Sequence, residues 1–383
     1  MTRREAIAGS SVAAMMGASE IPGLEASVVK RHDDAVDRLL KTQITDPGDE
    51  HRGGLPDAYG LFYAGTAAGI TDSFNAAFHH RLSRFYKDPL MVQRLKLAIG
   101  FAVRSQTRDG NIDLPITNFN SPPDTAFAVW GAAPAAHIAR EHGTKEIVAA
   151  IEPFLRNATR ALATGGVHTP NHRWVVCSAL AQIHELYPDP RLVKRIDQWL
   201  AEGIDIDEDG QYDERSVLMY NIHVNRALII TAQKLKRPEL LEPVRRNLDA
   251  MFYLMHPGDE LVSEISRRQD RDQRGDIGAY WFPMHYMTAQ DGNPRYAWVA
   301  RKYAAERAGL SLLMEYPELL RPLPAAVAPE QNYERVFPKL EIVRIRRGTR
   351  SATIMLHEDS RFFQLRNGDA VISAIRFASA FFW

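Results

Sequence analysis

Apolar residues recur at helical spacing from about residue 30 to about residue 315, and no convincing strand interrupts them. The spacing predicts roughly twelve helices that come in pairs. Such a run suits a closed ring of helical hairpins or a helical solenoid. The sequence carries no repeat consensus of the short solenoid families. We therefore expect a six-hairpin (α/α) toroid.

Residues typical of helix ends and loops separate these segments, such as Ser121-Pro122 and Thr169-Pro170 at helix starts and Asp209-Gly210 in a loop. The predicted helices cover residues 30–43, 56–70, 73–87, 89–107, 122–141, 144–163, 170–186, 189–202, 216–235, 237–255, 277–290 and 294–311.

After Leu320 the pattern changes from helical spacing to partial alternation. Residues 340–347, 351–356, 361–365 and 370–383 are predicted strands, with Gly348-Thr349 as a turn. The fold class is thus mainly α, a toroid followed by the start of an antiparallel β-sheet domain. A few strands do not make a stable sheet domain alone. They either pack on the helical domain or belong to a longer protein, and we expect the second.

The predicted domain boundaries follow from these patterns. An export signal and irregular start cover 1–29, the toroid 30–320, a proline-rich linker 321–335 and the sheet 336–383.

The N-terminus pairs Arg3 with Arg4 ahead of a weakly apolar stretch, Ala6 to Ala18, which is too short and too polar to span a membrane. This resembles a twin-arginine export signal, with a mature start between residues 19 and 30. The alternative is a disordered start. The signal predicts a periplasmic or secreted protein. The single cysteine, Cys177, excludes an intrachain disulfide and reads as a buried, inert thiol.

Charge and motifs exclude several classes of function. Lys+Arg and Asp+Glu both number 47, so a nucleic-acid binder that relies on a global positive field is not expected, although a local basic groove stays possible. There is no Gly-rich phosphate loop, no Gly-x-Ser-x-Gly elbow and no His-Glu-x-x-His. We expect no cofactor and assign no metal ligand. The sequence leaves the oligomeric state open.

The segment from Thr169 to Trp174 holds the first candidate catalytic residues, Asn171 and His172. Thr169 is a suitable helix cap, so both residues fall in the first turn of the helix. The free N–H groups and the positive helix end there favour an anion and keep imidazole neutral, so that His172 can accept a proton. The alternative is that both side chains only satisfy loop carbonyls.

The second segment runs from Asp209 to His223 and is a loop followed by a helix that Ser216 could cap. Tyr220 and His223 lie three apart and so share a helix face. A tyrosine can act as acid or base when a cation such as Arg215 lowers its pKa. An isolated helical tyrosine is more often a packing residue, and Tyr212 in the loop is the rival phenol.

Two further stretches are candidates for substrate binding. Residues 264–275 contain four arginines among carboxylates, and Arg267 and Arg268 could line a rim that holds carboxylate or sulfate. A self-paired, solvated loop is the alternative. Asn118 begins a run of amides that leads to Phe127 and Trp130, which suits sugar recognition or ordinary helix packing.

With Asn171-His172 and Asp209-Gly210-Gln211-Tyr212…Tyr220-Asn221, the chain resembles the toroid-type polysaccharide lyases. These include chondroitin AC/hyaluronate lyases, heparinase II/III-like proteins and oligoalginate lyases. The resemblance implies that Asn171 neutralises a uronate carboxylate, His172 abstracts the ring proton and Tyr220 protonates the leaving oxygen. Because Arg173-Trp174 follows Asn-His, the subfamily and the substrate stay open.

We therefore expect β-elimination on an acidic polysaccharide. Neutralising the carboxylate stabilises the enolate-like transition state, and a positioned base and acid lower the rest of the barrier. One alternative is a toroid glycoside hydrolase that uses two acids. The other is a non-catalytic glycan-binding protein. The candidate acids are Asp124, Asp205, Asp207, Asp213 and Glu214.

Overall fold

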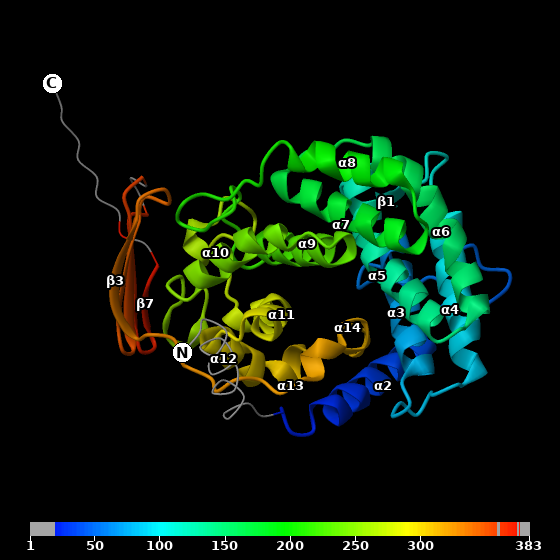
Figure 1. Cartoon of the computed structure of the whole chain (residues 1–383), viewed down its shortest axis with the longest axis horizontal. Helices are drawn as coiled ribbons and strands as arrows, with labels where there is room; N and C mark the ends of the chain where they lie inside the picture. Colours follow the sequence, from blue (N-terminus) through cyan, green and yellow to red (C-terminus); the bar gives the residue numbers. More distant parts are fainter. Residues whose placement is uncertain (1–19, 358–360, 374, 376–383) are drawn as a thin grey trace, which may run out of the picture.

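The structure, a computed structural model, describes residues 20–357, 361–373 and 375. The Arg3-Arg4 segment and the end of the last predicted strand, residues 376–383, lie outside the described residues. Helices arranged as a ring make up most of the chain, and a sheet stands at one side of it (Figure 1).

The ring has two layers, which confirms the predicted toroid of paired helices. The long inner helices α3, α5, α7 and α9 contact one another in sequence order, and each is preceded by an outer helix. The inner layer comprises α3 (Ala64–His79), α5 (Pro122–Glu141), α7 (Pro170–Leu186), α9 (Tyr220–Leu235), α11 (Trp281–Asp291) and α14 (Leu310–Glu315). The outer layer comprises α2 (Leu24–Thr42), α4 (Pro89–Arg104), α6 (Lys145–Thr164), α8 (Pro190–Leu200), α10 (Leu241–Met251) and α12 (Pro294–Lys302).

The last helical segments close the ring. Helix α14 returns to contact α2, α3 and α5, and the short helix α13 (Ala304–Arg307) lies against α2. The Arg31 guanidinium of α2 donates to the carbonyl oxygens of Ala305 and Ala308. A charged donor on two backbone acceptors fixes α2 to α13 and the residue that follows it.

Close backbone packing sets the spacing of the inner layer. A Cβ at Gly131 of α5 would lie 2.7 Å from the Cα of Gly69 and 2.8 Å from the carbonyl oxygen of Ala68, both in α3. Only glycine permits this approach, so α5 and α3 sit nearer than ordinary side chains would allow.

The predicted helices 122–141 and 170–186 are confirmed, but 56–70 and 73–87 are wrong, since one helix, α3, spans Ala64–His79. The carboxylate of Asp57 accepts from the N–H groups of Tyr59 and Leu61, which closes a tight loop before α3. After α3, Ser83 donates its hydroxyl to Asp33 of α2 and holds residues 80–88 as turns. Hydrophobic spacing does not detect either contact.

Two antiparallel sheets complete the fold. Strands β1 (Ile112–Leu114) and β2 (Asn118–Ser121) pair ahead of α5, and a five-stranded meander follows the ring in the order β3-β4-β5-β6-β7. Its strands are β3 (Asn332–Phe337), β4 (Ile342–Arg347), β5 (Arg350–Met355), β6 (Phe363–Asn367) and β7 (Ala370–Ile372). Strand β3 begins inside the range predicted as linker, and the turn at 348–349 is confirmed.

The five-stranded sheet packs on the ring through a buried arginine. Arg344 of β4 is 0% exposed, and its guanidinium donates to the carbonyl oxygens of Met255 at 2.8 Å, Ala352 at 3.1 Å and Tyr253 at 3.3 Å. The carbonyls of Met255 and Tyr253 belong to the ring, so the charge of Arg344 joins the two parts.

A buried histidine–carboxylate pair reinforces this contact. The His256 ring lies 2.8 Å from Ser351 Oγ of β5 through Nδ1 and 3.0 Å from Glu264 Oε1 through Nε2. Burial opposes the charge of Glu264, but the hydrogen bond from His256 and the nearby Arg344 hold its pKa down, at about 2. The sheet is therefore held to the ring by buried hydrogen bonds that involve charged side chains.

Within residues 20–357, 361–373 and 375, no helix has the length and apolarity needed to cross a membrane. Cys177 is buried, and burial raises the pKa of its thiol, as expected of an inert cysteine.

Replacing Arg344 with alanine should destabilise the protein strongly, because it leaves ring carbonyls unpaired in a dry interface. We expect a loss of about 3–5 kcal/mol in the free energy of unfolding, measured by urea denaturation. The matched control is Arg350→Ala, an exposed arginine on the next strand, which should change it by less than about 0.5 kcal/mol. Equal effects of the two variants would contradict this role of Arg344.

Candidate active site

Aromatic side chains from the N-terminal parts of α5, α7 and α9 lie close together. The Phe127 ring of α5 lies 6.2 Å from the His172 ring of α7 and 5.3 Å from the His223 ring of α9, between ring centroids. Tyr220 lies 6.2 Å from His223. The structure thus brings three of the four predicted catalytic side chains to one half-buried cluster.

Asn171, the fourth, lies next to His172 but is fully buried. Its backbone N–H donates to Glu214 Oε2 at 3.2 Å and its side-chain Nδ2 donates to the same oxygen at 2.7 Å. The predicted cap, Thr169, makes no side-chain capping bond to the helix backbone. The anion expected at the start of α7 is therefore supplied by the protein itself, as Glu214.

These contacts occupy the amide of Asn171. Besides Glu214, its Nδ2 also donates to Thr169 Oγ1 at 3.2 Å. The side-chain oxygen Oδ1 is buried without a partner among the described residues. Asn171 thus presents an acceptor rather than a donor in this state, and a carboxylate arriving here requires its amide to turn.

His172 and His223 are neutral imidazoles. Burial, with smaller effects from the charges of His168, Arg268 and His223, lowers the pKa of His172 to about 4. Burial and then the charge of Arg226 lower the pKa of His223 to about 4. Neutral His172 was expected, but burial is the main cause rather than the helix end.

Tyr220 is the half-buried phenol of the cluster. Its hydroxyl accepts from Gln269 Nε2 at 2.5 Å, and the guanidinium carbon of Arg268 lies 5.1 Å from its ring centroid. Helix α9 begins at Tyr220 rather than at the predicted residue 216, because the Ser216 hydroxyl accepts from the N–H of Tyr220 at 3.0 Å. This places Tyr220 at the helix start, where its side chain has room to meet a ligand.

The rival phenol lies elsewhere. Tyr212 is 2% exposed, its hydroxyl donates to Asn225 Oδ1 at 2.8 Å, and burial raises its pKa well above the usual value. A phenol so placed does not reach a ligand at the helix ends, so the geometry disfavours the predicted substrate contact of Tyr212.

Arg215 also points away from the cluster. Its guanidinium donates to the carbonyl oxygens of Lys339 at 2.8 Å and Leu340 at 3.3 Å, in the turn between β3 and β4. Arg215 thus ties the loop to the sheet instead of acting on a phenol.

The other predicted binding residues differ in their surroundings. Arg267 is exposed and pairs with Asp213 at 3.1 Å, whereas Arg268 lies 3.4 Å from Glu214, beside Tyr220. Trp130 is buried, and its indole N–H donates to Ser178 Oγ at 2.8 Å. The centroid of its ring lies 6.0 Å from that of the His223 ring.

The side chain of Asn118 donates to Asp124, in the first turn of α5, at 3.2 Å. Of the predicted binding residues, Arg268 is the one that contacts the phenol.

The acids considered for a hydrolase are engaged in local structure. Asp124 accepts from Ser121 at the start of α5, and Asp205 accepts from Trp174 Nε1 at 2.8 Å. Asp207 accepts from the N–H of Gln211 at 2.9 Å, and its pKa is raised, mainly by burial.

Sequence reasoning missed His168 and Gln269. The ring of His168 lies 4.8 Å from that of His172, and Gln269 binds the hydroxyl of Tyr220. His168 directly precedes the candidate segment 169–174, and Gln269 lies within the arginine-rich stretch 264–275. Neither was predicted, because an uncharged side chain in a loop gives no periodic signal. Across the described residues, no group of three or more His, Cys, Asp or Glu is placed to hold a metal ion.

Comparison with known proteins finds no matching family model and no match among curated proteins. Solved structures do match. The chondroitin AC lyase of Streptomyces coelicolor A3, in complex with chondroitin sulphate, has a TM-score of 0.63 at 14% identity, covering 87% of this chain and 50% of that one. A variant of the same lyase gives a TM-score of 0.55 at 13% identity, with coverages of 87% and 50%.

A Paenibacillus xanthan lyase has a TM-score of 0.62 at 11% identity, covering 89% of this chain and 35% of that one. The chain therefore spans half or less of the length of these enzymes. At such identities the match concerns the fold: this is the helical toroid with an antiparallel sheet of the polysaccharide lyases.

His172 and His223 should titrate near pH 4, well below an ordinary histidine at about 6.5. Arg268→Gln should raise the pKa of His172, because it removes a positive charge, and should leave that of His223 nearly unchanged. Titration of the ring carbons by NMR measures both values. The control is Arg267→Gln, since Arg267 pairs with Asp213 instead. A His172 that titrates near 6.5 in the unmodified protein contradicts this burial effect.

Proposed function

We propose that the protein is a polysaccharide lyase that cleaves a uronate-containing polysaccharide by β-elimination. The observation that carries this proposal is the cluster itself. A neutral, half-buried histidine and a half-buried tyrosine from different helices meet beside an arginine, on the fold of known polysaccharide lyases. That set contains a proton acceptor, a proton donor and a cation for a carboxylate.

Arg268 is the group that would hold the substrate carboxylate. Its side chain is partly exposed, and its Nε lies 3.4 Å from Glu214. Asn171 would join it once its amide turns from Glu214 and Thr169 toward the ligand. Neutralising the carboxylate lowers the energy of the enolate-like transition state formed when the C5 proton leaves.

His172 would abstract the C5 proton. Its imidazole is neutral, and its Nδ1 is buried without a partner among the described residues. In the free protein its pKa of about 4 makes it a weak base. A bound carboxylate adds a negative charge nearby, which favours imidazolium and raises this pKa toward the value that proton abstraction requires.

Tyr220 would protonate the leaving oxygen. As the C5–H electron pair forms the C4–C5 double bond, the C4–O4 bond breaks and O4 takes the phenolic proton. Gln269 donates to the phenol oxygen and can stabilise the phenolate that results. His223, which lies between Phe127, Trp130 and Tyr220, would orient the phenol and return its proton.

Export through the twin-arginine segment, to the periplasm or beyond, is part of the same proposal, because polymeric substrates are met outside the cell membrane. Its support is the Arg3-Arg4 pattern. Cell fractionation of the protein with and without Arg3→Lys/Arg4→Lys tests it, and equal export of both forms would contradict it.

The test of the activity is incubation with chondroitin, hyaluronan, xanthan and alginate, followed by ultraviolet absorbance and reducing-end assays. A lyase raises both signals, a hydrolase raises reducing ends alone, and a binding protein raises neither. If none of these uronate polymers yields an unsaturated product, the lyase proposal is refuted.

Tyr220→Phe should lower kcat by about 10²–10⁴-fold and leave KM within a few-fold, because it removes only the proton donor. The matched control is Tyr212→Phe, the buried phenol of the same segment. It loses one hydrogen bond to Asn225 and should lose stability by about 1 kcal/mol with kcat retained. If Tyr212→Phe lowered kcat and Tyr220→Phe did not, the proton donor would be Tyr212 instead.

A further inference from the structure

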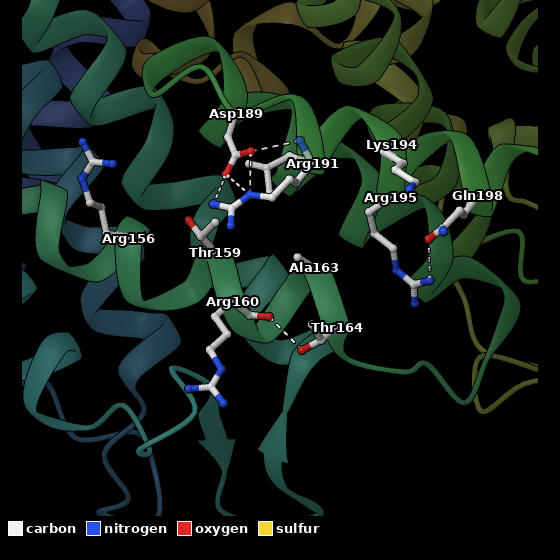
Figure 2. Close-up of a pocket in the computed structure, with 11 residues that line it drawn as sticks. Arg156, Thr159, Arg160, Ala163, Thr164, Asp189, Arg191, Lys194, Arg195 and Gln198 are labelled. Atoms are coloured by element: carbon white, nitrogen blue, oxygen red, sulfur yellow. Dashed lines mark hydrogen bonds and ion pairs between the residues drawn. The ribbon is translucent and has the colours of Figure 1, made fainter.

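A cleft of about 570 Å³ lies between α6 and α8 in the outer layer of the ring (Figure 2). No histidine or tyrosine lines it, so it offers no base for elimination and is distinct from the cluster described above. Most of the charged residues that line it are positive. Five cations line it, Arg156, Arg160, Arg191, Lys194 and Arg195, against one acid, Asp189.

The positions of these cations are unfavourable for the helices that carry them. Arg156 and Arg160 lie four apart on α6, and on α8 Arg191 is followed by Lys194 and Arg195 at three and four residues. Like charges at this spacing repel each other. In a chain with 47 cationic and 47 acidic residues, such a concentration indicates an anionic ligand.

Two of the five charges are compensated within the protein. Arg156 Nε lies 2.7 Å from Glu152, and Arg191 Nη2 lies 2.7 Å from Asp189. Among the residues that the structure describes, Arg160, Lys194 and Arg195 form no ion pair. Three positive charges are therefore left for a ligand.

Arg195 is held in place for such a ligand. Its guanidinium stacks 4.2 Å from the Trp199 ring centroid, and its terminal nitrogens donate to Gln198 Oε1 and to the carbonyl oxygen of Gly165, each at 3.2 Å. Its Nε is buried without a hydrogen-bond partner among the described residues. A guanidinium fixed in this way loses little entropy when it binds an anion.

We propose that this cleft is a second, non-catalytic site that binds an acidic polysaccharide through its sulfate or carboxylate groups. The uncharged lining fits sugars: Thr159 and Thr164 donate their hydroxyls to backbone carbonyls and keep lone pairs for sugar hydroxyls. Nucleic acid fits less well, because the two aromatic rings nearby, Trp199 and Tyr187, are covered by Arg195 and Arg156 and are not free for base stacking.

One hydrogen bond connects the cleft to the loop that precedes α7. Arg195 contacts Gly165, the first residue of the loop that carries His168 and ends at the start of α7. A polymer held in the cleft would be kept near that helix end and raise the local substrate concentration. That the bound polymer is also the substrate rests on the proposed function, whereas the binding of an acidic sugar chain does not.

The test compares the full chain with an Arg160→Gln/Lys194→Gln variant, in which two exposed charges are removed without touching the cluster of Tyr220. We expect the variant to bind chondroitin sulphate about tenfold more weakly at low salt, with a shallower salt dependence. The control is Lys41→Gln/Arg81→Gln, two exposed cations elsewhere, which should bind within about twofold of the parent.

Neutral dextran and single-stranded DNA of matched charge serve as competing ligands. Unchanged binding of chondroitin sulphate by the cleft variant would overturn the proposal, and so would tighter binding of the DNA by the parent protein. Turnover of a short uronate oligosaccharide should be the same in parent and variant. If neither has lyase activity but their affinities differ as expected, the proposed function fails and the second site stands.

Discussion

The bond between Glu214 and Asn171 is the interaction on which the candidate site depends. One carboxylate oxygen accepts both the backbone and the side-chain N–H of a residue 43 positions earlier in the sequence. It joins the loop before α9 to the first turn of α7, so it fixes Tyr220 relative to His172. Burial raises the pKa of Glu214, and the two bonds from Asn171 lower it. This carboxyl thus sits between opposing effects at the point where a substrate carboxylate would arrive.

Much of the fold could be predicted from the sequence. The starts of α5 and α7 follow from a proline in the first turn, together with the capping Ser121 in α5, which are local signals. The region around α3 could not be predicted this way, because the bonds made by Asp57 and Ser83 end the helix at points where apolar spacing continues. Strand β3 was missed because it follows a proline-rich stretch and shows little alternation.

The site shows the same division. Local sequence placed Asn171, His172, Tyr220 and His223 at two helix starts, and the ring brings these starts together. Choosing between Tyr220 and Tyr212 required burial, a tertiary property, and Arg215 proved to belong to the contact with the sheet. The histidines are neutral chiefly because the folded chain buries them, which no sequence motif predicts.

The joint between the loop at 209–215 and the sheet has a further consequence for evolution. Arg215 binds two carbonyl oxygens of the β3–β4 turn, and the carboxylate of Asp209 accepts the N–H groups of Lys339 and Leu340. All four partners are backbone atoms. These four bonds therefore place no demand on the side chains of the turn, except that proline cannot occupy the two donor positions, whereas they constrain the side chains at positions 209 and 215. Selection to keep these bonds would therefore conserve positions 209 and 215 but not the side chains that face them. Covariation between this loop and the β3–β4 turn would not reveal these bonds.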